Sequence, residues 1–191
     1  FKDPVWSQAQ PHLAIQTEAG RPWMDSSGNT WLDPYNTQAW EYILAVSMLA
    51  VDLGFDEVQL DYVRFPTDGK IKEIRYGGGA QAQTKAEVID AFIAYMREAL
   101  ARAGCWLSAD IFGIAVVNKG DIEGLGQDFE RLALSADSLC PMIYPSHYAN
   151  KRQNGQGQRV NGVLFEAPDL EPYAVVYNTL LGQLWEDRGD L

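Results

Sequence analysis

Stretches with helical periodicity alternate with strand-like stretches along this chain, and this alternation constrains the fold more than any other feature of the sequence. Apolar residues recur at helical spacing in 36–54, 84–104, 120–135 and 168–187. Short apolar or alternating runs typical of strands lie between them, at 56–63, 105–113 and 137–148. Strands that alternate with helices of this length form βαβ units around a parallel sheet. The sequence therefore predicts an α/β fold.

Composition predicts a folded domain and argues against two classes of partner. Of the 191 residues, 47% are hydrophobic, which is enough for a large core. The net charge of -11 argues against nucleic acid and anionic membranes, because proteins that hold phosphate groups present basic patches. No apolar run reaches the roughly 20 residues that span a bilayer. Cys105 and Cys140 lack metal-ligand spacing and are expected to be buried thiols.

Capping signals and apolar faces can be read in the predicted helices. Thr84 and Glu87 form a capping box at the start of 84–104, and Asp121 is the expected cap of 120–135. Gly54 is expected to end the first helix. The apolar faces predicted from helical spacing are Tyr42, Val46, Leu49 and Leu53 in the first helix, Val88, Phe92, Tyr95 and Ala99 in the second, and Tyr173, Val176, Tyr177, Leu180 and Leu184 in the last.

The long connections follow the strands, whereas the helix-to-strand connections are short. The long connections are residues 65–84, 113–120 and 145–168. Long loops at the carboxyl ends of parallel strands hold the functional sites of α/β proteins. The segment 145–168 is rich in Gly, Asn and Gln, and we predict that it forms a flexible lid rather than a linker.

Two neighbouring strands each direct an aspartate to the same side near their carboxyl ends. Alternation places Gln59 and Asp61 on one face of the first strand, and it places Ser108 and Asp110 on one face of the second. A polar face suits the interior of a barrel near its mouth, because open parallel sheets are covered by helices on both faces. The residues expected to pack against helices are Val58, Leu60, Tyr62, Leu107, Ala109 and Ile111.

Two carboxylates in these positions fit the chemistry of a retaining glycosidase. Neighbouring strands lie about 4.8 Å apart, so the carboxyl groups could approach the separation of about 5 to 5.5 Å found in such enzymes. The reaction needs one ionised nucleophile and one protonated acid. Arg64 would keep Asp61 ionised, whereas the apolar neighbours of Asp110 favour its neutral form. Asp61 is the predicted nucleophile and Asp110 the predicted acid/base, the alternative being two structural hydrogen-bonding residues.

The same motifs resemble those of a known family. "GFDEVQLDYVRFP" at 54–66, "SADIFG" at 108–113 and "PMIYPSHY" at 141–148 look like segments of a bacterial family of domains of unknown function. That family is described as glycoside hydrolases with a (β/α)8 barrel that is distantly similar to the α-amylase-like enzymes. "FKDP" at 1–4 and "WLDPYNTQAWEY" at 31–42 also resemble family segments, so the likeness extends from residue 1 to about residue 180.

The resemblance implies a partial barrel with its site at the strand ends. Asp61 would end the fourth strand, Asp110 the fifth, and 144–147 the sixth; the amylase-like enzymes usually carry a glutamate rather than an aspartate on the fifth. A TIM-like (β/α)8 barrel needs about 250 residues, so we expect about strands 3 to 6 here, with exposed edges. A longer chain or a partner chain would supply the rest. The full-length protein is expected to be secreted or in the cell envelope.

Further residues are predicted to contact a sugar, although each has a structural role as its alternative. Exposed aromatic rings stack on sugars, but aromatic side chains more often pack in cores. Asp68 and Glu166 are alternative acids. A metal site built from Asp61, Asp110 and His147 is left open, although the spacing is not that of a zinc motif, and no cofactor is predicted. The predicted substrate-binding residues are Gln59, Arg64, Trp31, Tyr144, His147 and Tyr148.

These observations favour a retaining glycoside hydrolase acting on an oligo- or polysaccharide. One alternative is a non-catalytic carbohydrate-binding barrel, in which the acids bond sugar hydroxyls without turnover. The other is an assembly domain whose exposed strand edges pair with another chain.

Overall fold

The computed structural model describes residues 1–77, 82–121 and 124–186, the last five of these by their backbone alone. The chain is a mixed α/β protein. Its contacts divide it into two compact units. The first unit comprises Phe1–Asp110 with Gly120–Cys140, and the second comprises Ile111–Lys119 with the residues from Pro141 onward.

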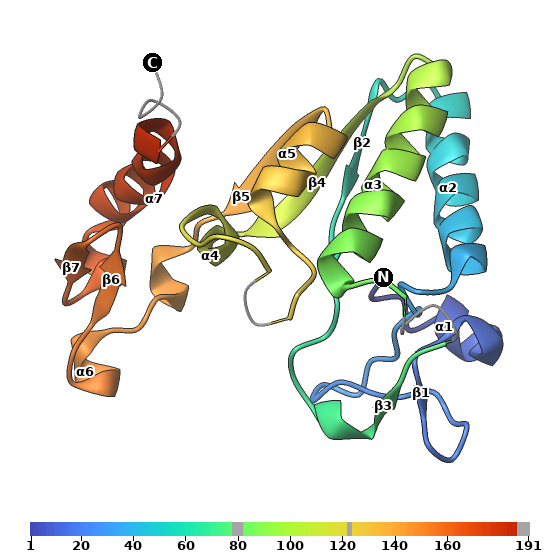
Figure 1. The fold of residues 1–191 in the computed structure, drawn as a ribbon, viewed down its shortest axis with the longest axis horizontal. Helices are drawn as coiled ribbons and strands as arrows, with labels where there is room; N and C mark the ends of the chain where they lie inside the picture. Colours follow the sequence, from blue (N-terminus) through green and yellow to red (C-terminus); the bar gives the residue numbers. More distant parts are fainter. Residues whose placement is uncertain (78–81, 122–123, 187–191) are drawn as a thin grey trace. The chain divides into compact units, whose positions relative to one another are not determined.

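A three-stranded sheet carries the predicted strands. It consists of β2 (Glu57–Leu60), β4 (Trp106–Phe112) and β5 (Ser138–Met142), with β4 in the middle (Figure 1). β2 and β4 run parallel, in a register from Glu57 opposite Trp106 to Leu60 opposite Ala109. The predicted parallel pairing is confirmed for these two strands. Among the described residues the sheets are small and open, so the closed barrel stays a prediction.

Two long helices of the first unit begin where the sequence predicts. α2 (Thr37–Asp52) is capped by the Asn36 side chain, which accepts a hydrogen bond from the Gln38 N–H. α3 (Lys85–Arg102) starts with the predicted capping box: Thr84 Oγ1 accepts from Glu87 N at 3.2 Å, and Glu87 Oε2 accepts from Thr84 N at 2.7 Å. The two helices lie side by side (Figure 1). The buried face of α3 comprises Ala86, Val88, Ile89, Phe92, Ile93, Met96 and Leu100.

The apolar face predicted for α2 is largely exposed. Val46, Leu49 and Leu53 have exposed fractions of 50%, 63% and 80%, whereas the buried residues of this helix are Ala39 and Ser47. Helical spacing shows that side chains share a stripe, but it does not show which stripe contacts the neighbouring elements. The predicted stripe is therefore largely uncovered in the described part of the chain.

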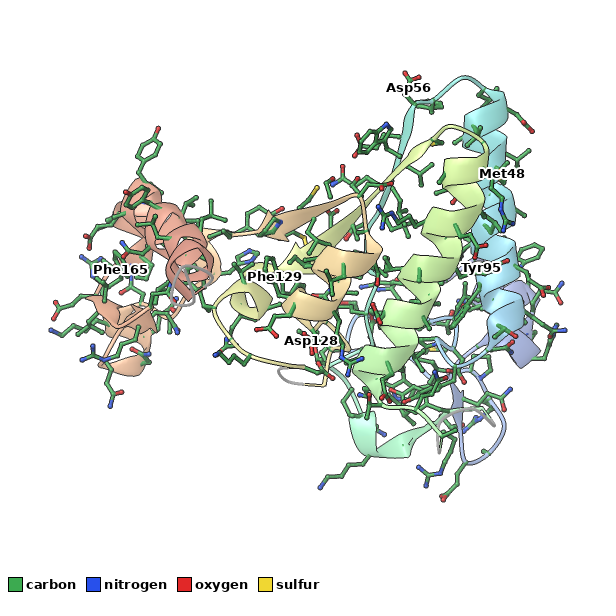
Figure 2. The ribbon with its side chains drawn as sticks, turned by 45° about the horizontal axis from the view of Figure 1, so that its top comes forward. Met48, Asp56, Tyr95, Asp128, Phe129 and Phe165 are labelled. Atoms are coloured by element: carbon green, nitrogen blue, oxygen red, sulfur yellow. The ribbon has the colours of Figure 1, made fainter. Side chains whose placement is uncertain are left out.

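The helix predicted over 120–135 is shorter and has a different cap. α5 spans Phe129–Ser135, and the Asp128 side chain accepts the Arg131 N–H at its start (Figure 2). Asp121, the predicted cap, instead accepts the Gly126 N–H at 2.8 Å. Gly126 has a φ of +80°, which is left-handed backbone that a helix does not contain. The glycines before Asp128 therefore belong to a loop.

The second unit contains a hairpin where a flexible lid was predicted. β6 (Gln158–Val160) and β7 (Val163–Phe165) pair antiparallel, after the short helix α6 (Lys151–Asn154). Asn161 and Gly162 connect the strands with φ values of +46° and +80°. These positive values belong to the two-residue turn that the Asn-Gly sequence favours. The segment 145–168 is therefore folded, and the Asn-Gly pair was a signal of this that the interpretation as a lid missed.

Helix α7 (Pro172–Glu186) buries a face other than the predicted one. Val175 and Thr179 are fully buried, and Val175 packs with Val160 and Phe165 of the hairpin (Figure 2 labels Phe165). The Thr179 hydroxyl donates to the Val175 carbonyl at 2.8 Å, which satisfies it inside the core. The residues predicted to face inward lie elsewhere: Tyr173, Tyr177 and Leu180 are 90%, 64% and 44% exposed, Val176 is half-buried, and the Leu184 side chain lies outside the described residues.

Short elements fill the regions that the sequence left as loops. In the first unit they include an antiparallel pair formed by β1 (Gln16–Thr17) and β3 (Ile74–Arg75). Cys105 is buried and Cys140 half-buried, both as free thiols. No helix in the described ranges is long and apolar enough to span a bilayer. The remaining short helices are α1 (Trp6–Ala9), η1 (Pro11–Leu13), η2 (Ile71–Glu73), α4 (Gly113–Val116), η3 (Pro145–His147) and η4 (Pro168–Leu170).

Candidate active site

The predicted pair of acids lies just beyond the last register pair of β2 and β4. Leu60 and Ala109 are the last partners in the register, and the next residues along the chain are Asp61 and Asp110. Asp61 is exposed and Asp110 is half-buried. Both acids therefore lie at the carboxyl-end rim of the parallel pair, where the sequence predicted them.

Gln59 contacts one of these acids directly. Its side-chain Nε2 donates to Asp110 Oδ1 at 2.5 Å. Gln59 lies opposite Ser108 in the register, and Asp110 is two residues further along β4, so both side chains are on the same face of the sheet. The predicted grouping of Gln59 with Asp110 on one face is thus observed, and the structure places the Gln59 amide against a carboxylate.

The Gln127 side chain forms hydrogen bonds to the main chain near both acids. Its Nε2 donates to the Val63 carbonyl and to the Asp110 carbonyl, both at 3.2 Å, and Gln127 is only 1% exposed. These bonds link the segment that follows β2 to the end of β4. No local sequence motif marks Gln127, because its hydrogen-bond partners are 64 and 17 residues away along the chain.

Hydrogen bonds to its backbone carbonyls hold the loop before Gln127 against other segments of the first unit. Phe65 N donates to Leu125 O at 2.8 Å, and Lys85 Nζ donates to Gly124 O at 2.9 Å. Gly126 lies so close to α3 that a Cβ there would be 2.7 Å from Ile89 Cγ1. The three residues that precede Gln127 are therefore held in place, and this restricts the position of the Gln127 amide.

The chain turns sharply after Asp61, and this reverses the predicted direction of Tyr62. Tyr62 has a φ of +52°, an uncommon value for a residue other than glycine, and its N–H donates to Asp61 Oδ1 at 2.6 Å. β2 ends at Leu60, so strand alternation does not extend to Tyr62. Tyr62 was predicted to face the helices, but it is 39% exposed and its ring contacts Trp31 edge-on, with ring centroids 5.8 Å apart.

Two cations flank the aromatic pair of Trp31 and Tyr62. Lys2 Nζ lies 5.0 Å from the Tyr62 ring centroid, and Arg64 Cζ lies 5.1 Å from that of Trp31 and 5.5 Å from that of Tyr62. These distances are within the range of cation–π contact. Arg64 is 8% exposed and donates to the Phe65 carbonyl at 2.8 Å.

Arg64 lies among several acids, and Asp61 is one of those whose charge acts on it. Burial lowers the pKa of Arg64, and the charges of Tyr62, Asp68 and Asp61 oppose that shift in this order. The group remains a cation, because arginine stays protonated even after large shifts. Its charge thus contributes to the electrostatic environment of Asp61, whereas its burial disfavours the predicted direct contact with a sugar.

Trp31 does not present an exposed ring. It is fully buried, and its Nε1 donates to Asp25 Oδ2 at 3.2 Å. The prediction that Trp31 stacks on a sugar is therefore wrong for this structure. Its indole instead supports Tyr62, whose ring is partly accessible.

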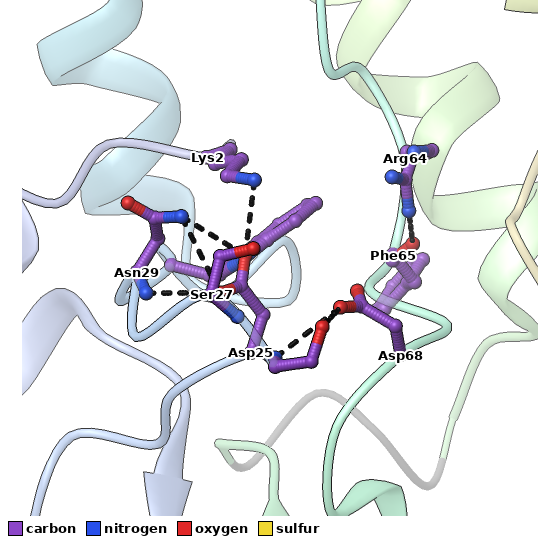
Figure 3. A network of polar contacts seen from close by, with 9 residues as sticks. Lys2, Asp25, Ser27, Asn29, Arg64, Phe65 and Asp68 are labelled. Atoms are coloured by element: carbon purple, nitrogen blue, oxygen red, sulfur yellow. Dashed lines mark hydrogen bonds and ion pairs between the residues drawn. The ribbon is translucent and has the colours of Figure 1, made fainter.

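Asp25 organises the base of this cluster (Figure 3). It is 6% exposed and forms an ion pair with Lys2 at 3.0 Å, and its Oδ1 accepts the Asn29 and Ser27 N–H groups at 2.9 and 3.0 Å. Burial alone would raise the pKa of Asp25, but the hydrogen bonds from Asn29, Lys2 and Trp31 together outweigh it and lower the pKa to about 2. Asp25 is therefore a charged structural anchor.

Replacing Asp25 by Asn is expected to lower the free energy of unfolding by about 2 kcal/mol at pH 7. The folded pKa lies below the ordinary value of 3.8, so this stabilisation is complete above about pH 4 and is lost as the pH falls towards 2. Urea unfolding of both proteins between pH 2 and 7 measures the difference. The exposed Asp52→Asn variant is the control, and an Asp25 effect that does not change with pH would contradict the assignment.

Asp33 is a buried acid that no sequence motif marks. It is 3% exposed, and its carboxylate accepts the Tyr35 N–H at 2.9 Å and the Gly77 N–H at 2.6 Å. Burial raises the pKa of Asp33, while these two hydrogen bonds act in the opposite direction. Because both bonds come from the backbone, Asp33 holds two loop segments together.

The remaining candidates lie in the second unit. The rings of Tyr144 and His147 are in edge contact, with centroids 5.1 Å apart, and His147 lies in the single turn η3. Tyr148 packs against the hydrophobic core formed by Val160, Phe165 and Val175. Tyr144 and His147 are exposed, whereas Tyr148 is half-buried.

The alternative acids already have partners. Asp68 Oδ2 accepts hydrogen bonds from the Ser26 N–H and hydroxyl, and Glu166 pairs with Lys151 at 2.5 Å. Within the described ranges, no group of three or more His, Cys, Asp or Glu side chains is placed to hold a metal ion. Asp61 and Asp110 thus remain the pair with the most direct support from geometry.

The parallel strands with acids at their carboxyl ends define an α/β domain, the kind of protein that carries its functional sites at this edge of the sheet. The chain belongs to the DUF4015 family, described as a "putative glycosyl hydrolase domain", whose pattern matches residues 1–186.

The chain is similar over part of its length to a solved structure. That structure is of a hypothetical protein from Ruminiclostridium thermocellum ATCC 27405, with 44% sequence identity and a TM-score of 0.51. The match covers 58% of this chain and 54% of that one, so the chain spans about half the length of this relative. No curated protein matches the sequence.

Proposed function

We propose that this protein is a retaining glycoside hydrolase that cleaves an oligo- or polysaccharide, with Asp61 as nucleophile and Asp110 as acid/base. The observation that carries the proposal is the register of β2 and β4, in which an aspartate follows each member of the last pair. Adjacent strands lie about 4.8 Å apart, which is compatible with the carboxyl separation of about 5 to 5.5 Å in retaining enzymes. Family membership supports the same class of reaction.

The hydrogen bonds of the two acids suggest which oxygen of each one reacts. The Tyr62 N–H occupies Asp61 Oδ1, so we assign the attack on the anomeric carbon to Oδ2. The Gln59 amide occupies Asp110 Oδ1, so the proton for the leaving oxygen is assigned to Asp110 Oδ2. As the bond between Asp61 and the anomeric carbon forms, the glycosidic carbon–oxygen bond breaks and the leaving oxygen takes this proton.

The second step releases the sugar. Water attacks the anomeric carbon, the bond to Asp61 breaks, and Asp110 takes the proton from the water. Each step inverts the anomeric centre, so the product has the configuration of the substrate. Tyr62 takes the place of Trp31 as the aromatic ring proposed to contact the sugar, because its ring is partly accessible.

The proposal extends to the fold. β2, β4 and β5 would be the fourth, fifth and sixth strands of a (β/α)8 barrel, with α3 and α5 as the helices between them. The parallel pairing of β2 with β4 and the polar residues on one face support this arrangement.

A glycan screen with the full-length protein, followed by NMR of the first-formed product, tests the function. We expect hydrolysis with the anomeric configuration retained. An inverted product would overturn the two-step mechanism and leave hydrolysis intact. A measurable glycan affinity without turnover would overturn catalysis and favour the carbohydrate-binding alternative.

One observation favours the assembly alternative. The exposed stripe of α2 continues past the helix to Phe55, which is 60% exposed. Exposed apolar side chains in a contiguous row mark surfaces that another polypeptide segment covers. This alternative predicts a concentration-dependent increase in mass, which sedimentation analysis would detect.

A further inference from the structure

We propose that Gln59 is the positioning residue of Asp110, holding one carboxyl oxygen while the other exchanges the proton. The inference rests on the proposed function and assigns Gln59 a role other than sugar binding. Its basis is the contact of 2.5 Å between Gln59 Nε2 and Asp110 Oδ1. Gln59 comes from β2 and Asp110 from β4, so the bond crosses the strand pair that carries both acids.

An amide is suited to a carboxyl group that alternates between two protonation states. Its N–H donates to an ionised carboxylate, and its carbonyl oxygen can accept from a carboxylic acid after rotation of the amide. With the N–H on Oδ1, a proton on Asp110 is confined to Oδ2. A glutamate at this position would repel the ionised form, and a leucine would contact neither form by hydrogen bonding.

The main chain of Asp110 is fixed independently of its side chain. Gln127 Nε2 donates to the Asp110 carbonyl, and the loop held in place before Gln127 restricts its position. With the backbone held, the carboxyl group keeps its rotation about the side-chain bonds, and Gln59 restricts that rotation. Gln127 therefore holds the main chain of Asp110, and Gln59 holds its carboxyl group.

The other titratable groups near Asp110 come from the neighbouring strands. Burial raises the pKa of the Cys140 thiol on β5, and the charges of Asp110 and Glu57 raise it further. Asp61 follows β2 on the adjacent strand end. Gln59 is not titratable, and its amide donates a hydrogen bond directly to the Asp110 carboxyl.

The first measurement is independent of turnover. The Asp110 carboxyl is titrated by 13C NMR in the full-length protein, with its signal identified by its loss in Asp110→Asn. Removing the N–H donor disfavours the ionised form, so Gln59→Leu is expected to move the titration midpoint upward by about one pH unit. Gln59→Glu is expected to move it further. The control Glu57→Gln, at the start of the same strand, should move it less than either, and an unchanged midpoint in Gln59→Leu would overturn the contact.

The second measurement separates positioning from general damage. Gln59→Leu is expected to lower kcat/KM, which reports the first step, about 10- to 100-fold on a natural glycoside, whose leaving group needs a proton. The loss should be much smaller on the 2,4-dinitrophenyl glycoside of the same sugar, because that leaving group departs without protonation. Equal losses on both substrates would overturn the positioning role. If Asp61→Asn and Asp110→Asn both retain full activity, the proposed function fails instead, and the NMR midpoint still decides the Gln59 contact.

Discussion

Replacing Asp61 by Asn is expected to lower hydrolysis by the full-length protein by at least about 10³-fold, which corresponds to about 4 kcal/mol of lost transition-state stabilisation. The amide cannot form the covalent intermediate of a retaining reaction. The fold should survive, because Asp61 is exposed and its recorded contact is with the N–H of the next residue. Initial rates on the substrate found by the glycan screen measure the effect.

Two companion variants make the Asp61 result specific. Asp56→Asn changes an exposed acid immediately before β2, at the opposite end of the strand, and should leave the rate within about twofold of the wild type. Asp61→Ala leaves space for an external nucleophile, so azide should restore turnover and give a glycosyl azide of inverted configuration. Full hydrolytic activity in Asp61→Asn would remove Asp61 from the mechanism.

Replacing Gly126 by Ala is expected to lower the free energy of unfolding by about 2 to 5 kcal/mol. Left-handed backbone costs an L-residue about 1 to 2 kcal/mol, and Gly126 has a φ of +80°. The added Cβ would also lie 2.7 Å from Ile89 Cγ1 and 2.9 Å from the Lys85 carbonyl, which adds about 1 to 3 kcal/mol of overpacking. Equilibrium urea unfolding measures the loss.

Gly120→Ala is the matched control for this packing term. Gly120 precedes the same loop with a φ of +74°, but a Cβ there would meet nothing within 4 Å. We expect this variant to lose about 1 to 2 kcal/mol, from backbone strain alone. Equal losses in the two variants would show that the close approach of the loop to α3 contributes nothing. Because Gly126 adjoins Gln127, its variant should also lower activity more than the control does.

Local signals explain the parts of the fold that could be predicted. Thr84 and Glu87 begin α3 because their hydrogen bonds join residues three apart, so sequence spacing alone specifies them. The alternation of strands and helices likewise predicted β2, β4 and β5. The Asn161–Gly162 turn was equally local, and the hairpin it joins was predictable in principle.

The faces of the helices depended on contacts that are distant in sequence. The stripe predicted for α7 has the correct period, but the hairpin packs against Val175 on another side of the helix. Periodicity identifies residues that share a stripe, and only the neighbouring element decides which stripe it covers. The same reason explains why Leu49 on α2 is exposed.

The sequence by itself determined which acids form the candidate site, which strands carry them and that they lie at the strand ends. Strand alternation and βαβ order are local properties, so they place Asp61 and Asp110 without further knowledge. The tertiary structure alone decided how these acids are held. Gln59 reaches Asp110 across 51 residues of sequence, and Gln127 reaches Val63 across 64. Such hydrogen bonds join residues with no periodic relation, so they are set only when the strands pair and the loop docks.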